Sequence, residues 1–140
     1  MNNWFECIIK HETVDSSGII VSAQSKVIIN STSYTDVENK LSLLKGVELP
    51  EEFFVTNIKK ALFEDIIIQP DPEYWFKAKV IFLEINEKNG KPKKTPKSFL
   101  IPGHDFISST TLLNEYIKNN YITDSYIHTI SLTNITYIVR

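Results

Sequence analysis

Two stretches decide the fold, Trp4-Phe5-Glu6-Cys7-Ile8-Ile9 and Trp75-Phe76-Lys77-Ala78-Lys79-Val80, which align at an offset of 71 residues. One inserted residue changes the offset to 72, so that Gly18 falls on Gly90, and the offset stays at 72 to the end. The later pairs are Ile28-Ile29 with Leu100-Ile101, Leu41 with Leu113, Leu44 with Tyr116, Phe54 with Tyr126, Ile58 with Ile130, and Phe63 with Ile135. Because order and spacing agree along the whole chain, we predict two copies of one structural unit.

The boundary between the copies is Gln69–Pro72, where two prolines fix their own backbone and restrict the residue before them. The chain of 140 residues has the usual length of one domain. We therefore predict a single compact domain, residues 1–140, made of a repeat over residues 1–70 and a repeat over residues 71–140.

Each repeat is predicted to run strand, strand, helix, strand. The composition favours strands, because 20 Ile, 8 Val, 11 Thr and 16 aromatic residues stand against 3 Ala. The expected strands are Trp4–Val14, Ile19–Asn30 and Phe53–Ile68 in the first repeat, and Trp75–Asn86, Thr95–Ile101 and Tyr126–Val139 in the second. Turns rich in Asp, Ser, Asn and Gly join the first two strands of each repeat into a hairpin. Prolines 92, 96 and 102 favour a sheet edge for the Thr95–Ile101 strand.

The helices are expected from apolar residues at helical spacing. In the first repeat, Val37, Leu41 and Leu44 follow Ser33 or Thr35, either of which can cap a helix. In the second repeat, Ser108 or Ser109 precedes the stripe formed by Leu112, Leu113, Tyr116 and Ile117. The predicted fold class is α+β, in which two β-β-α-β repeats form about six mostly antiparallel strands with two helices. The long closing strands could be bent or broken, in the first repeat at Lys59-Lys60.

Four blocks of the sequence resemble a known family. They are Asn3-Trp4-Phe5-Glu6-Cys7, Phe54-Val55-Thr56-Asn57-Ile58-Lys59-Lys60, Trp75-Phe76-Lys77-Ala78-Lys79-Val80 and Glu84-Ile85-Asn86-Glu87-Lys88-Asn89-Gly90-Lys91. The chain is similar in these blocks to short, uncharacterised proteins of Bacteroidetes and of their crAss-like bacteriophages, a family described as a domain of unknown function. The resemblance implies a phage or mobile-element gene, but it supplies no catalytic residues.

The sequence argues against enzyme chemistry. Cys7 lies inside a predicted strand, and its counterpart is an alanine, which favours a small core residue over a nucleophile. His11, His104 and His128 are far apart and have no ligand spacing for a metal. The four glycines build no phosphate-binding loop. We expect no cofactor, no metal and no enzyme activity, and we expect a cytoplasmic protein because no apolar run reaches the ~20 residues of a membrane span.

One segment concentrates charge. Five lysines lie within ten residues of the second hairpin, namely Lys88, Lys91, Lys93, Lys94 and Lys97. Residues 1–70 carry 6 basic and 10 acidic groups, whereas residues 71–140 carry 9 and 7, so the halves have net charges of −4 and +2. Lysines beside aromatic rings such as Tyr74, Trp75 or Phe76 could hold a single-stranded nucleic acid by phosphate contacts and base stacking. Alternation allows only one of Trp75 and Phe76 into the core.

Two functions remain open from the sequence. The first is a small, non-enzymatic accessory protein that binds single-stranded nucleic acid through the lysine-rich hairpin. The second is a protein-interaction or assembly module that meets a partner, or another copy of itself, through exposed sheet edges or an uncovered sheet face. In this second case the lysines and prolines only protect a strand edge from aggregation.

Overall fold

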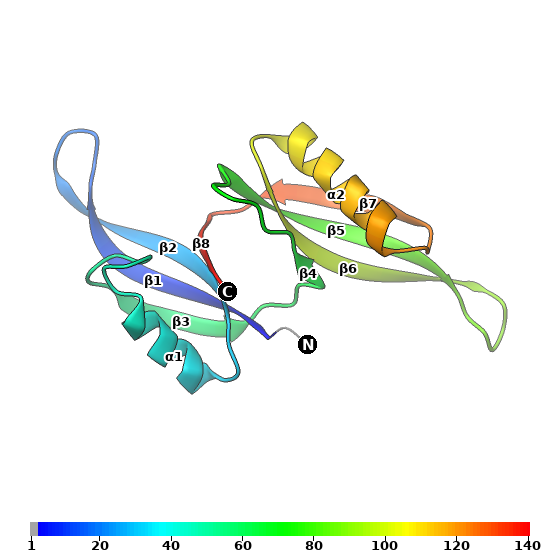
Figure 1. The fold of residues 1–140 in the computed structure, drawn as a ribbon, viewed down its shortest axis with the longest axis horizontal. Helices are drawn as coiled ribbons and strands as arrows, with labels where there is room; N and C mark the ends of the chain where they lie inside the picture. Colours follow the sequence, from blue (N-terminus) through cyan, green and yellow to red (C-terminus); the bar gives the residue numbers. More distant parts are fainter. Residues whose placement is uncertain (1–2) are drawn as a thin grey trace. The chain divides into compact units, whose positions relative to one another are not determined.

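The computed structural model describes residues 3–140 and divides the chain into two compact units (Figure 1). Unit 1 holds the chain up to Leu62 together with Asn134–Arg140, and unit 2 holds Phe63–Thr133. In chain order the elements are β1 (Trp4–Val14), β2 (Ile20–Asn30), α1 (Tyr34–Leu43), β3 (Phe54–Lys60), β4 (Asp65–Ile66), β5 (Tyr74–Ile85), β6 (Pro92–Gly103), α2 (Phe106–Asn120), β7 (Ser125–Leu132) and β8 (Ile135–Val139). The α+β class is as predicted, but the described residues form eight strands rather than six.

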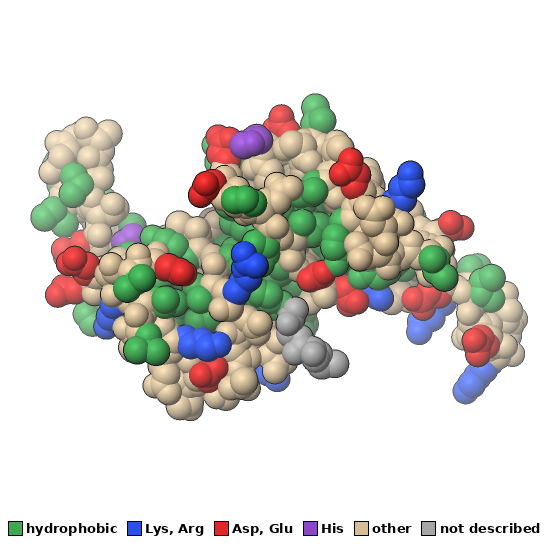
Figure 2. Space-filling view, in the orientation of Figure 1, with side chains coloured by type: hydrophobic (Ala, Val, Ile, Leu, Met, Phe, Trp, Pro, Cys, Tyr) green, Lys and Arg blue, Asp and Glu red, His purple; other side chains and the backbone are tan. Residues whose placement is uncertain are grey.

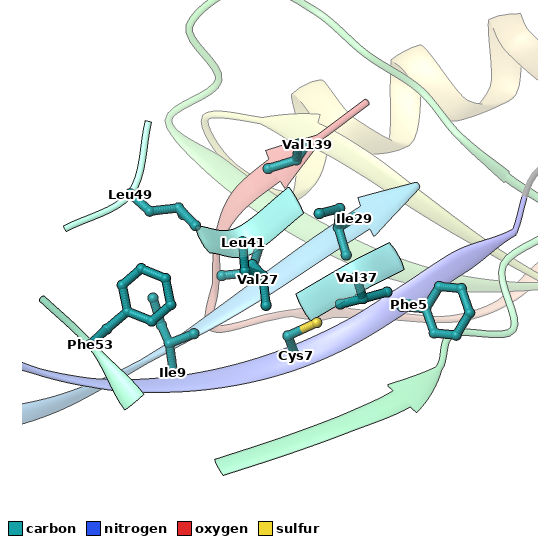
Figure 3. Close-up of a cluster of buried hydrophobic side chains, with 10 residues drawn as sticks. All are labelled: Phe5, Cys7, Ile9, Val27, Ile29, Val37, Leu41, Leu49, Phe53 and Val139. Carbon is teal, nitrogen blue, oxygen red and sulfur yellow. The ribbon is translucent and has the colours of Figure 1, made fainter. Parts of the chain in front are cut away.

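Unit 1 is a four-stranded sheet, in the order β3-β1-β2-β8, with α1 packed on one face. β1 and β2 form an antiparallel hairpin, β3 pairs antiparallel with β1, and β8 pairs parallel with β2. Alternate residues of β1 and β2 point toward the helix, because side chains alternate across a strand. The core that they build with α1, the segment before β3 and β8 contains Phe5, Cys7, Ile9, Val27, Ile29, Val37, Leu41, Leu49, Phe53 and Val139 (Figure 3).

Unit 2 has the corresponding arrangement, with the strand order β4-β6-β5-β7 and α2 on one face. β5 pairs antiparallel with both β6 and β7, and β4 pairs parallel with β6. The buried cluster beneath α2 contains Ala78, Val80, Phe82, Phe99, Ile101, Leu113 and Ile117.

Both helices begin at capping residues. The Ser33 hydroxyl accepts a hydrogen bond from the Asp36 N–H, so the first of the two predicted caps is correct. In α2 the cap is Asp105, three residues before the predicted Ser108, and the two form a capping box. The sequence analysis missed this cap because it placed the start of the helix at the serines rather than at the carboxylate before them.

The closing segments are not continuous strands. The first breaks into β3 and β4, and the second into β7 and β8, which accounts for the two additional strands. β4 does not join the sheet that contains β1–β3 but pairs with β6, while β8 pairs with β2. Each sheet is thus completed by a strand from the other half of the sequence.

The edge position predicted for the second returning strand is only partly correct. β6 starts at Pro92 rather than at residue 95, and it lies between β5 and β4. Its pairing with β4 is confined to Phe99 and Leu100, so the prolines fall where that side of β6 has no partner strand. None of the helices formed by residues 3–140 has the length and apolar character needed to cross a bilayer.

Candidate functional site

Both hairpins extend beyond the strands that flank them. In unit 1, pairing with β3 stops at Lys10 and pairing with β8 starts at Lys26, so residues 11–25 form a two-stranded projection that we call arm 1. In unit 2, pairing of β5 with β7 stops at Phe82 and β4 pairs only from Phe99, which leaves residues 83–97 as arm 2. Figure 2 shows hydrophobic side chains at the tip of arm 1, at the left, and charged side chains on arm 2, at the right.

The predicted lysines all lie on arm 2, but they do not form one surface. Lys88 and Lys91 belong to the turn, and the Lys88 N–H is held by the Asn86 side chain. Lys93 is paired with Glu84, on the side of the sheet that carries the helix, while Lys94 is paired with Leu83 on the opposite side. Lys88, Lys91, Lys93 and Lys94 are all exposed, but the two on the strand, Lys93 and Lys94, point to opposite faces.

Lys97 is occupied by contacts within unit 2. Its ammonium lies 3.7 Å from Glu64 Oε1, 5.2 Å from the centre of the Phe82 ring and 5.6 Å from that of Tyr121. These contacts hold the side chain over the buried cluster, where it covers apolar surface. Lys97, predicted as a phosphate contact, is therefore already paired with Glu64, a residue 33 positions earlier in the chain.

The predicted stacking aromatics are not beside the lysines. Phe76 is 2% exposed and packs edge-on against Phe106, with 5.0 Å between the ring centres. It therefore has no free ring face for a base. Trp75 is also buried, at 6%, which corrects the expectation that only one of the two could enter the interior. Tyr74 is 45% exposed, but it begins β5, a full strand away from the lysine turn.

Arm 1 carries an exposed apolar tip instead of lysines. Its exposed aliphatic side chains are Val14 at 62%, Ile19 at 60%, Ile20 at 65% and Val21 at 37%. Between residues 11 and 25 the chain has two acidic residues and neither Lys, Arg nor Pro. The sequence analysis did not single out these residues, although four aliphatic residues on both sides of a polar turn are a visible signal.

The charge asymmetry between the halves disappears at the level of the folded units. Unit 1 carries 7 basic and 8 acidic residues and unit 2 carries 8 and 9, so each has a net charge of −1. The exchange of the closing segments moves Glu64 and Asp65 into unit 2 and Arg140 into unit 1. The remaining contrast is between the arms, since arm 1 has two acids and no lysine while arm 2 has five lysines and two acids.

Two side chains that could take part in catalysis, Cys7 and His11, are not arranged for it. Burial and the nearby Glu6 charge raise the pKa of the Cys7 thiol to about 12, which keeps it protonated. His11 Nε2 lies 2.8 Å from Ser25 Oγ, but its Nδ1 faces the Glu12 carbonyl oxygen at 3.4 Å rather than an orienting carboxylate.

A pocket of about 390 Å³ lies in unit 2 and is lined by residues 69–73 and by the start of α2. In this pocket His104 Nδ1 lies 2.7 Å from Glu73 Oε2, and both side chains are largely exposed to solvent. Over residues 3–140, no three His, Cys, Asp or Glu side chains are placed to hold a metal ion.

Comparison with known families gives one match. The family model described as "Domain of unknown function (DUF4494)" covers residues 3–140 of the chain. The chain belongs to this family. No curated protein and no solved structure matches the sequence.

Membership in DUF4494 therefore names the family without assigning chemistry to any residue. The candidate interface rests on the two arms alone. The strand register sorts their side chains into a face toward the helix of the unit and a face away from it, which we call the far face. The far face of arm 1 includes Val14 and Ile20, and that of arm 2 includes Leu83 and Lys94.

Proposed function

We propose that this protein is a non-enzymatic interaction module that binds another protein chain through arm 1. The observation that carries the proposal is the tip of this arm, where four aliphatic side chains are between 37% and 65% exposed. Apolar clusters of this kind on soluble proteins mark interaction surfaces. A two-stranded ribbon with no flanking strand is also only marginally stable in water, so a partner that covers it would stabilise it.

The composition of the two arms supports the same choice. Strand edges are protected in nature by lysines and prolines. Arm 2 has both, including Pro92 and Pro96, whereas arm 1 has neither. Arm 1 is therefore the projection open to a partner.

Site-specific photo-crosslinking tests the proposal. A photoreactive amino acid replaces Ile20, and the control position is Ile122, which is fully exposed in the connection after α2. In the native cell, position 20 should crosslink to a defined protein that position 122 does not label, and Val14→Ser should abolish the crosslink. Identical labelling from both positions would contradict a binding role for arm 1.

A second candidate function is nucleic-acid binding by arm 2. It is favoured by the exposure of Lys88, Lys91, Lys93 and Lys94, against two acidic residues on the same arm. If each of these lysines neutralises one phosphate of a single strand, log affinity should fall with log salt with a slope of roughly −3. Changing all four to Gln should remove most of that slope in fluorescence anisotropy, while Lys97→Gln, the matched control, should leave it intact. Binding that is absent at low salt, or indifferent to the four changes, would eliminate this candidate.

An internal duplication underlies the proposed architecture. In support, the exchanged strands pair at equivalent positions of the two repeats. Ile28 pairs with Ile138 and Leu100 with Ile66, and Val27 pairs with Tyr137 and Phe99 with Asp65, all related by the offset of 72.

Further features repeat at the expected offsets. The equivalent pairs are the N-caps Ser33 and Asp105, the ring contacts Phe5–Tyr34 and Phe76–Phe106, the bulges opposite Ile8/Ile9 and Lys79/Val80, and the positive-φ turn glycines Gly18 and Gly90. A shared ancestral unit accounts for all of them together. The proposal extends to the setting that the sequence resemblance implies, a phage or mobile-element gene of Bacteroidetes. It also keeps the predicted cytoplasmic location, which is the host cytoplasm for a phage-encoded protein.

A further inference from the structure

The far face of arm 1 has an apolar tip followed by a row with a negative charge. Val14 lies opposite Ile20 at the tip, and both are more than 60% exposed. In the next row, Glu12 lies opposite Ser22, and both are exposed. Neither Lys nor Arg occurs on this arm.

The far face of arm 2 has the same layout with the opposite charge. Ile85, which is 74% exposed, lies opposite Pro92 at the tip. In the next row, Leu83 is 38% exposed and lies opposite the exposed Lys94. The two arms therefore present matching apolar tips and complementary charges.

We infer that arm 1 of one copy of this chain packs, far face against far face, on arm 2 of a second copy. The inference rests on the proposed function and names its partner. Val14 and Ile20 cover Ile85, and Glu12 lies beside Lys94. Since the contact uses two different surfaces, the copy that contributes arm 1 keeps its arm 2 unused, the other copy keeps its arm 1 unused, and further copies add head to tail.

Charge decides against the two symmetric alternatives. Pairing arm 1 with arm 1 would bring Glu12 and Asp15 of both copies together with no lysine to compensate. Pairing arm 2 with arm 2 would bring together ten lysines and four acids, five and two from each copy. Only the mixed pair joins arms of opposite net charge, which favours encounter and orientation. Pro92 and Pro96 lack an N–H, so arm 2 offers its face rather than the edge of β6.

Sedimentation velocity on the full-length protein tests the inference. A contact of two small ribbons is in the weak class below about 1,200 Å², so the protein is studied from roughly 0.05 to 1 mM. Wild-type protein should form concentration-dependent oligomers at about 0.05 M salt that dissociate at about 0.5 M salt.

Two single-arm variants show which surfaces are used. The arm 1 variant is Val14→Ser with Ile20→Ser, and the arm 2 variant is Leu83→Ser with Ile85→Ser. Each variant alone should remain monomeric, because one side of every contact is missing. An equimolar mixture should give dimers and nothing larger, since only one kind of contact can form.

A charge exchange provides a test that does not depend on the apolar tips. Glu12→Lys and Lys94→Glu should each weaken association about fivefold, and the two changes together should restore it. All of these side chains are exposed, and unchanged thermal melts verify that the variants are folded.

Three outcomes would overturn the inference. They are a monomer at every concentration, oligomers that both single-arm variants retain, and oligomers that the arm 1 variant loses while the arm 2 variant keeps them. In the first case, a crosslink from Ile20 to a different protein would still support the proposed function.

Discussion

At the scale of single residues, Glu6 on β1 connects three adjacent strands of unit 1. Its Oε1 lies 2.8 Å from the Lys26 ammonium on β2, and its Oε2 lies 3.2 Å from that of Lys59 on β3. Burial alone would raise the pKa of Glu6. The hydrogen bonds and charges of the two lysines outweigh burial and hold the pKa below its ordinary value of 4.5.

This pKa predicts how stability depends on pH. Because the folded-state pKa is lower than the unfolded one, ionised Glu6 stabilises the fold above the ordinary pKa, and this contribution is lost as pH falls through the lowered value. Glu6→Gln should lower the free energy of unfolding by about 1 to 2 kcal/mol at pH 7 and have little effect below the lowered pKa.

Urea unfolding of the wild type and of Glu6→Gln, at pH 7 and at a pH below the lowered pKa, measures the difference in the free energy of unfolding. Glu64→Gln is the matched control, because Glu64 pairs with one lysine, Lys97, at 3.7 Å, and its side chain is 41% exposed. Its effect should be smaller. An equal loss at both pH values for Glu6→Gln would show that the carboxylate charge is not the cause.

The two tryptophans show what sequence can predict about single residues. Their equivalent positions predicted similar burial, and both are 6% exposed. Strand alternation failed for the neighbouring Phe76, because it assumes that only one face of a strand is buried. Trp75 and Phe76 lie on opposite faces of β5, and both are covered.

At the scale of elements, local signals located both hairpins and both helices. Turn residues, apolar spacing and capping side chains act within a few residues, so a sequence shows them directly. The closing strands were predicted only in part. A break at Lys59-Lys60 was anticipated, and β3 ends at Lys60, but the pairing of the chain after the break was not predicted. Residues 53–68 have the composition of one strand, but the Ala61 N–H binds the Trp4 carbonyl at the end of β3, and the chain then continues into another sheet.

The lysine-rich hairpin could likewise be predicted only in its local features. Its register could be predicted from the turn, and with it the separation of Lys93 and Lys94 onto opposite faces. The contact between Lys97 and Glu64 could not, because it depends on β4 pairing with β6. Composition cannot show which sheet a short strand joins.

At the scale of the whole molecule, each sheet depends on a strand from the other half of the sequence. Val139 of β8 is 8% exposed and belongs to the core of unit 1, although it lies at the end of the second half. Ile66 of β4 is 6% exposed and pairs with Leu100 in unit 2, although it lies at the end of the first half. A side chain of β4 strengthens this attachment, since Asp65 accepts a hydrogen bond from the Tyr116 hydroxyl on α2.

Because β4 and β8 each complete the sheet of the other half of the chain, a substitution in one of these strands should destabilise the unit whose sheet the strand completes. Trp4 reports on unit 1 and Trp75 on unit 2, so each is followed alone in a Trp→Phe background of the other. Val139→Ala should cost about 1 to 2 kcal/mol and lower the thermal midpoint seen by Trp4 more than that seen by Trp75. Ile66→Ala should cost about 2 to 3 kcal/mol, because it removes buried side-chain atoms from unit 2. It should lower the thermal midpoint seen by Trp75 more than that seen by Trp4. If Ile66→Ala acted first on Trp4, or if both reporters always shifted equally, the effects would not follow the exchanged strands and this prediction would be wrong.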